Sequence, residues 1–322
     1  MGLDFERHEN SRETTNSRSI VLCFDGTNNE YGKKNTNVLR LYSFLVKTSP
    51  KQRVYYQSGL GTFATHGLKT ISKVLDLAFA HGLPTHVMDG YRFLMQYYRD
   101  GDKVSIFGFS RGAYTARVLA SMVNRVGLLP PEHHAHMKNA WSHFKEGDEG
   151  ECRKFRQSFS REVEIVFMGL WDTVASVGIY GLELPFAQDN GGVKVVRHAL
   201  SLDERREKFQ ASFFEQGDKS DVKEVWFAGC HADVGGGAVD ETEQNLLSNN
   251  SFRWMINELF KYDSDVQILF HTGKLQREAG YIQKKYEEAP TRGYLWLESI
   301  PEDFLKQYGL KKLKLSKREQ EG

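Results

Sequence analysis

The stretch 103–118 constrains the fold more than any other part of the chain. Apolar residues near its start predict a short buried strand, and Gly108-Phe-Ser-Arg-Gly112 follows in the pattern G-x-S-x-G. A helical pattern continues from there without a break. Both glycines are needed in this context, because a Cβ atom would clash where the strand and the helix nearly touch. The stretch therefore predicts a nucleophile elbow with Ser110 at its tip.

Strand-like and helix-like segments alternate along most of the chain. We expect strands at 20–24, 53–57, 104–107, 164–168 and 222–228. Apolar residues at helical spacing predict helices between the strands, one of them through 195–202. This alternation is typical of an α/β fold, in which a mostly parallel sheet carries helices on both faces. We predict an α/β-hydrolase-like architecture.

Polar residues follow the predicted strands at the points where the strands end. These residues include Asp25, Ser58, Ser110, Asp172 and His231. Parallel strands bring their carboxyl ends to one edge of the sheet, and ligands bind such sheets at that edge. The sequence therefore predicts that these side chains gather along a single edge.

Three of these residues occur in the order of a catalytic triad. In elbow hydrolases the serine nucleophile is followed by an Asp or Glu and then by a His, and Ser110, Asp172 and His231 obey that order. A serine hydroxyl needs a base to take its proton, and the base needs an orienting acid. We predict Asp172 as the acid and His231 as the base. Asp233 stays open as a rival acid, and His198 stays open as a second base candidate, although its predicted helical setting favours a structural role.

Backbone donors for an oxyanion hole are predicted from two places. One is the N–H group of Arg111, the residue after the nucleophile, and the other belongs to the loop that follows the first strand. That loop contains Gly26 and Thr27, and the glycine would let the backbone approach a substrate. Asp25 in the same loop and Phe109 beside the nucleophile are predicted to contact the substrate.

The chain length and the polar N-terminal stretch indicate the domain organisation. We expect a disordered arm over 1–18 and a single α/β-hydrolase domain over 19–322. Insertions that supply the pocket walls are predicted near 63–83, 130–160 and 178–193.

Composition narrows the function classes. A formal net charge of +1 gives no reason to expect a nucleic-acid partner. Three cysteines form no even disulfide framework, and the first residues lack the apolar core of a signal peptide. The histidine-rich segment 133–143 has neither metal-ligand spacing nor cysteine partners, so no metal and no cofactor are predicted. We expect a cytoplasmic protein without a transmembrane segment, whose peripheral contact with a membrane stays open.

Five motifs together resemble those of a single family. They are Phe24–Asn28, Gly108–Ala113, Gly169–Val174, Arg197–Glu204 and Trp226–Gly236. In this order they resemble the α/β-hydrolase domain of the type VI secretion lipase effectors, which is shared with uncharacterised bacterial and fungal proteins. The resemblance covers roughly residues 19–260. It implies a serine esterase fold and phospholipase activity, and it makes Ser110 the nucleophile.

The expected function is therefore hydrolysis of a small-molecule or lipid ester, including phospholipid acyl esters, through an acyl-enzyme. Two alternatives stay open. Phosphatases of the haloacid-dehalogenase type carry an Asp nucleophile after their first strand, and Asp25 occupies such a place, but the second Asp expected two residues later is missing. A binding protein that uses the hydrolase fold without catalysis is the other alternative.

Overall fold

A computed structural model of the protein describes residues 17–26, 32, 34–59, 71–174, 192–206, 209, 211–214, 220–240 and 246–271. Within these residues six strands form one sheet in the order β2-β1-β3-β4-β5-β6, and every neighbouring pair is parallel. The strands are β1 Ser19–Phe24, β2 Gln52–Gln57, β3 Lys103–Phe109, β4 Ile165–Trp171, β5 Val195–Ser201 and β6 Asp221–Phe227. This arrangement confirms the predicted α/β class and all five predicted strands.

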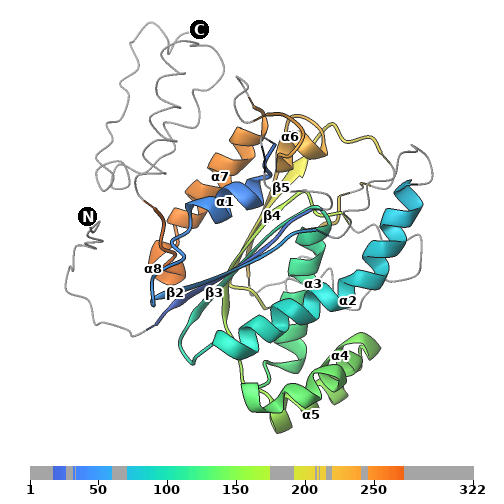
Figure 1. Cartoon of the computed structure of the whole chain (residues 1–322), viewed down its shortest axis with the longest axis vertical. Helices are drawn as coiled ribbons and strands as arrows, with labels where there is room; N and C mark the ends of the chain where they lie inside the picture. Colours follow the sequence, from blue (N-terminus) through green and yellow to red (C-terminus); the bar gives the residue numbers. More distant parts are fainter. Residues whose placement is uncertain are drawn as a thin grey trace, which may run out of the picture.

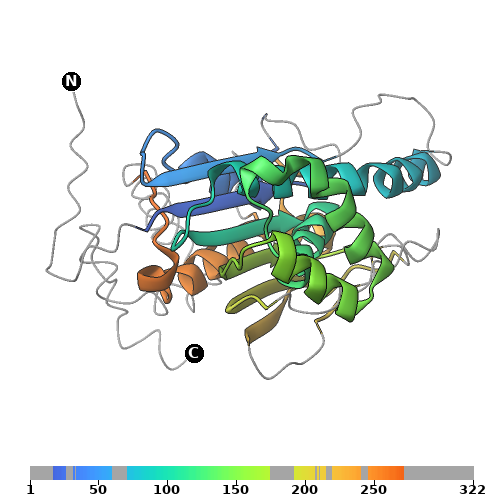
Figure 2. The same ribbon diagram turned by 90° about the horizontal axis from the view of Figure 1, so that it is seen from below.

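Helices cover both faces of the sheet (Figures 1 and 2). The helices α2, α3, α4 and α5 lie on one face, and α1, α7 and α8 lie on the other. Their bounds are α1 Asn37–Phe44, α2 Ile71–Tyr97, α3 Arg111–Val126, α4 Met137–Glu146, α5 Glu149–Phe159, α6 His231–Gly235, α7 Ser248–Phe260 and α8 Asp263–Val266, with a 3-10 helix η1 at Pro131–His136. Among the described residues, no helix is both long and apolar enough to cross a membrane.

The central strands are apolar throughout because both of their faces are buried. In β1, Ile20, Leu22 and Phe24 pack into the core beneath α2 and α3. The alternating residues Val21 and Cys23 pack into the other core, beneath α1 and α7. Successive side chains of a strand point to opposite faces, so one strand contributes to two hydrophobic layers.

The strand order puts a topological switch point between β1 and β3. From β1 the chain first adds β2 on one side, and it then returns to add β3 and the later strands on the other. In open parallel sheets, ligands bind outside the carboxyl ends of the strands at such a point. Asp25 follows β1 and Ser110 follows β3, so these two residues stand at the switch point.

The helix predicted through 195–202 is wrong, because this segment is the strand β5. The spacing of Val195 and Ala199 fits one helical face, but all seven residues of β5 are buried, as in a strand covered on both sides. Valines at 193, 195 and 196 also favour a strand. The strands β4 and β6 pair with the two edges of β5, and this pairing favours a strand over the helix that the spacing suggests.

The segment 130–160, predicted as an insertion, is mostly helical. It forms η1, α4 and α5, and the last two bury Phe144 and Phe155 against the core. Of the other two predicted insertions, 63–83 overlaps the helix α2 from Ile71 onward, whereas its first residues and nearly all of 178–193 lie outside the described residues. Arg18, predicted to belong to the N-terminal arm, pairs with the buried Asp102 at 2.6 Å.

Candidate active site

Ser110 stands on a sharp turn between β3 and α3. Its backbone has φ 57° and ψ −125°, a conformation that non-glycine residues rarely adopt. The flanking glycines allow this turn. A Cβ atom at Gly112 would lie 2.3 Å from the carbonyl oxygen of Phe24, and one at Gly108 would lie 2.6 Å from the Cα atom of Ala113. The local geometry is that of the predicted elbow.

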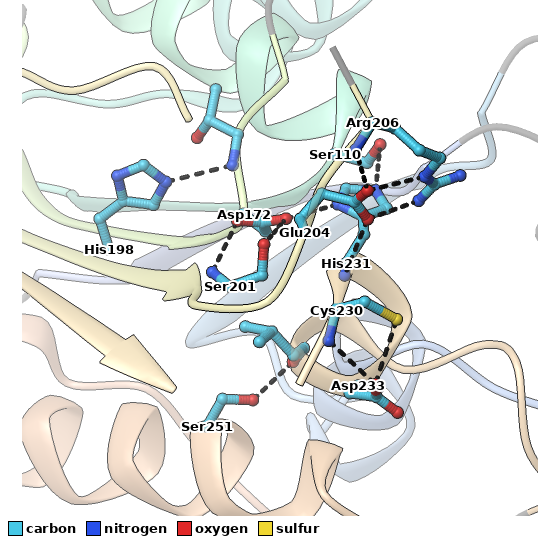
Figure 3. A network of polar contacts seen from close by, with 12 residues as sticks. Ser110, Asp172, His198, Ser201, Glu204, Arg206, Cys230, His231, Asp233 and Ser251 are labelled. Atoms are coloured by element: carbon cyan, nitrogen blue, oxygen red, sulfur yellow. Dashed lines mark hydrogen bonds and ion pairs between the residues drawn. The ribbon is translucent and has the colours of Figure 1, made fainter. Parts of the chain in front are cut away.

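Three side chains form a continuous hydrogen-bonded chain at the carboxyl edge of the sheet (Figure 3). Ser110 Oγ lies 2.8 Å from Nε2 of His231, and Nδ1 of the same imidazole lies 2.6 Å from Oδ2 of Asp172. All three residues are buried. Because a carboxylate can only accept, Nδ1 donates to Asp172, which leaves Nε2 to accept the Ser110 hydroxyl proton. This arrangement can draw a proton from the serine as its oxygen attacks a substrate.

Asp172 is held from the neighbouring strand β5. Its backbone N–H donates to the carbonyl of Ala199 at 2.7 Å, and its own φ is +40°. The N–H of Ser201 donates to Oδ1 and the Ser201 hydroxyl donates to Oδ2, each at 2.8 Å. Both carboxylate oxygens of Asp172 therefore have a partner, and Oδ2 is shared between Ser201 and His231.

His231 is held between two aromatic rings. Phe109, at the end of β3, stacks on the imidazole with the centroids 4.7 Å apart, and Phe209 meets it edge-on at 4.9 Å. Gly235 in α6 packs against the Phe109 ring, where a Cβ atom would lie 1.8 Å from Cε2. Phe109, predicted to contact the substrate, is buried and lies directly against His231.

Asp233, the rival acid, points to a different group. Its carboxylate accepts the backbone N–H of Cys230 at 2.9 Å and closes the first turn of α6. This is the usual work of an acidic residue in the first turn of a helix. The structure brings Asp172 rather than Asp233 to the imidazole of His231.

His198 lies on β5 rather than on a helix, and it is fully buried. Its Nε2 accepts the backbone N–H of Thr173 at 3.1 Å, and its Nδ1 lies 2.9 Å from the Glu224 carboxylate. Burial lowers the pKa of the His198 imidazole, while hydrogen bonding to Glu224 raises it. Both ring nitrogens are thus engaged by residues other than Ser110.

The Asp25 carboxylate is buried, and it accepts hydrogen bonds from three neighbouring donors. The Gly26 N–H donates to Oδ1 at 2.7 Å, whereas the hydroxyls of Thr36 and Tyr56 donate to Oδ2 at 2.7 and 2.8 Å. Burial and the nearby Asp25 carboxylate raise the pKa of the Tyr56 hydroxyl. The carboxylate therefore fixes the loop after β1 to β2 and to the start of α1.

Of the three predicted oxyanion donors, Arg111 and Gly26 belong to the described residues. Arg111 is the first residue of α3 and directly follows Ser110. The Gly26 N–H is donated to Asp25, and Thr27 lies outside the described residues. In the part of the chain that the structure describes, no three His, Cys, Asp or Glu side chains gather as a metal site would require.

Ser201 and Phe209 were not predicted from the sequence to belong to the site. Ser201 ends β5, so the same rule that selected Asp25 and Asp172 would have selected it if 195–201 had been predicted as a strand. Phe209 belongs to a polar stretch without recognisable periodicity, and nothing in the sequence indicates that it reaches His231.

Comparison with known proteins finds a matching family model and a curated relative. The catalytic-domain model of the Tle1-like phospholipase effectors of the type VI secretion system matches residues 18–258. An uncharacterized protein of Saccharomyces cerevisiae is 38% identical over 229 residues, which are 63% of this chain and 34% of the relative. The chain thus spans about a third of the length of that relative.

Two solved structures are more distant. An uncharacterized protein from Pseudomonas aeruginosa is 19% identical with a TM-score of 0.45, over 76% of this chain and 46% of the other. The Tle1 effector bound to the VgrG spike of the type 6 secretion system is 20% identical with a TM-score of 0.41, over 69% of this chain and 52% of the other.

Proposed function

Because the chain belongs to the family of Tle1-like phospholipase effector catalytic domains, we propose that it is a serine hydrolase that cleaves carboxylic esters. Ser110 is the nucleophile, His231 the general base and Asp172 the orienting acid. The observation that carries the proposal is the hydrogen-bonded chain from Ser110 Oγ through His231 to Asp172, with bonds of 2.8 and 2.6 Å.

In the first half-reaction Ser110 Oγ attacks the ester carbonyl while His231 Nε2 takes the hydroxyl proton. The Asp172 carboxylate stabilises the imidazolium that forms and holds its tautomer. The carbonyl oxygen becomes an oxyanion, to which the Arg111 N–H donates from the start of α3. The Gly26 N–H is already donated to Asp25, which favours Thr27 as the second donor.

The tetrahedral intermediate then collapses, and the bond to the alcohol oxygen breaks. His231 returns its proton to that oxygen, so the alcohol leaves neutral and the acyl group stays on Ser110 as an ester. Water enters, gives a proton to His231 and attacks the acyl-enzyme. The second collapse releases the carboxylic acid and restores the Ser110 hydroxyl.

Lipid and phospholipid acyl esters are the substrate class that the family membership favours. The extension to these substrates rests on the family, since a Ser-His-Asp arrangement supports acyl transfer without distinguishing one acyl substrate from another. The phosphatase alternative finds less support, because three donors already occupy the Asp25 carboxylate that would have to attack phosphorus.

A fluorophosphonate probe tests the proposal, because it forms a stable bond only with an activated serine. We expect wild-type protein to be labelled and to hydrolyse short-chain and phospholipid esters. Ser110→Ala should lose both properties while keeping its circular dichroism spectrum, since a single oxygen atom is removed.

Three results would contradict the proposal. One is full labelling of a folded Ser110→Ala protein, which would move the reactive serine elsewhere. Another is hydrolysis of a phosphate-ester chromogen that Asp25→Asn abolishes and Ser110→Ala leaves intact, which would favour the phosphatase. Wild-type protein that neither reacts with the probe nor turns over any ester would favour a binding protein.

A further inference from the structure

The end of β5 and the residues after it have no part in the chemistry proposed above. They nevertheless contact both the residue assigned as acid and the residue assigned as base (Figure 3). We name residues 201–204 the positioning segment. Its first residue contacts Asp172, and its last two contact the turn that leads to His231.

Ser201 binds the Asp172 carboxylate through two donors at once. Its N–H reaches Oδ1 and its hydroxyl reaches Oδ2, both at 2.8 Å, and both residues are buried. Two donors on two oxygens fix the plane of a carboxylate, whereas one donor leaves it free to rotate. Oδ2 is thereby directed at Nδ1 of His231 and accepts a hydrogen bond from it at 2.6 Å.

Asp172 needs such a hold because its backbone is strained. A φ of +40° in a non-glycine residue persists only where the surroundings determine it. The bond from its N–H to Ala199 and the two bonds from Ser201 all come from β5, the strand beside β4. One strand end thus holds both the backbone and the side chain of the acid.

The other end of the segment holds the base. Asp203 accepts the N–H of Gly229 at 2.7 Å, and the Glu204 carboxylate accepts the N–H of His231 at 3.3 Å. Hydrogen bonds from the Arg206 side chain lower the pKa of Glu204 to about 2. Glu204 is therefore an anion at neutral pH, beside the first residue of α6.

We infer that residues 201–204 are the positioning element of the site, and that Ser201 is the positioning residue that orients Asp172 toward His231. This inference rests on the proposed function. Ser201 acts through Asp172 and touches neither the substrate nor the reacting atoms. Its hydroxyl also withdraws charge from the oxygen that His231 uses, so it weakens the attraction between the carboxylate and an imidazolium.

Ser201→Ala is the decisive variant because it removes the hydroxyl and keeps the N–H. With less charge withdrawn from Oδ2, the imidazolium is favoured, so the acid limb of the pH profile should move to higher pH. A hydrogen bond to a charged group is lost, and a more stable imidazolium gives its proton to the leaving alcohol more slowly, so kcat should fall about ten- to a hundredfold. KM should stay within about twofold, since no substrate contact is lost.

Two variants complete the set. Ser201→Thr keeps the hydroxyl and should restore the wild-type pH profile. Ser251→Ala is the matched control, because this buried hydroxyl on α7 donates to the Val234 carbonyl at 2.5 Å and has no contact with Asp172. It should leave the acid limb where it is. If Ser201→Ala does not fold, Ser201→Cys replaces it, since a thiol is a weak donor and should give the same upward shift.

The inference is overturned if folded Ser201→Ala, or Ser201→Cys in its place, keeps the wild-type kcat and pH profile. It is also overturned if Ser251→Ala shifts the acid limb as far as Ser201→Ala does. Titration of the His231 ring protons by NMR separates this failure from that of the proposed function. The upward shift between wild type and Ser201→Ala should appear there even if the wild-type protein cleaves no ester. If the probe does not label the wild-type protein and this shift is still observed, the proposed esterase is contradicted and the positioning role of Ser201 is retained.

Discussion

Thr173 donates its backbone N–H to Nε2 of His198 at 3.1 Å, directly after the residue assigned as the acid. An N–H donor requires a lone pair on Nε2, so the proton of the neutral ring is on Nδ1, where it faces Glu224. His198 is thus tied in its neutral form to the end of β4. Protonation would remove the acceptor that Thr173 uses.

Stability should consequently depend on pH through His198. Burial lowers the pKa of this imidazole in the folded protein, against an ordinary value of about 6.5. Between the lowered and the ordinary value the unfolded chain binds more protons than the folded one. The free energy of unfolding should therefore be highest above about pH 6.5 and fall as the pH drops below it, levelling off below the folded-state pKa.

Denaturant unfolding of wild type and of His198→Gln from about pH 7.5 to about pH 5 checks this. The glutamine can still accept from Thr173 through its carbonyl oxygen but does not titrate. Its curve should be flatter than that of the wild type, and parallel curves for the two proteins would show that His198 is not the group involved.

The base should be His231 and not His198. His231→Ala should lower kcat/KM by about a thousandfold or more, because Ser110 then has no acceptor for its proton. His198→Gln should retain far more activity, since its contact is with a backbone N–H. Kinetics on both purified variants decide between the two histidines, and the opposite ranking would reassign the base.

The elbow should tolerate no side chain at Gly112. A Cβ atom there would lie 2.3 and 2.5 Å from the carbonyl oxygens of Phe24 and Asp25, which are backbone atoms at the end of β1. Gly112→Ala should lower the free energy of unfolding by about 2–4 kcal/mol. Gly150→Ala in α5 is the control, since its Cβ would come no nearer than 3.1 Å, to a side-chain oxygen of Asp148. It should stay within about 1 kcal/mol of wild type.

The elbow could be predicted from sequence because its determinants are local. Gly108, Ser110 and Gly112 stand between a strand and a helix that have their own periodicity. Asp172 and His231 were reached through a rule about parallel sheets, which needs only the strand ends. Ser201 was missed because the spacing in 195–202 fits a helix as well as a strand, and neighbouring strands decided between them.

The hydrogen-bond partners of Asp25 could not be predicted from the sequence. Tyr56 lies on β2 and Thr36 at the start of α1, and neither has a pattern that pairs it with this carboxylate. Such contacts depend on how elements distant in the sequence pack, which periodicity does not specify. The sequence therefore predicted that Asp25 stands at the sheet edge but not what its oxygens bind.

Asp172 should be the acid and not Asp233, because the two carboxylates have different hydrogen-bond partners. Asp172 Oδ2 lies 2.6 Å from Nδ1 of His231, whereas Asp233 accepts the Cys230 N–H within α6. Asp172→Asn keeps the size of the side chain but removes the charge that stabilises the imidazolium and can favour the wrong tautomer. In the serine-protease template this change costs ~10⁴ in turnover. Asp233→Asn should cost far less, since an amide oxygen can still accept from Cys230. With both variants shown to be folded, kcat values decide the matter, and a greater loss in Asp233→Asn would transfer the role of the acid to that residue.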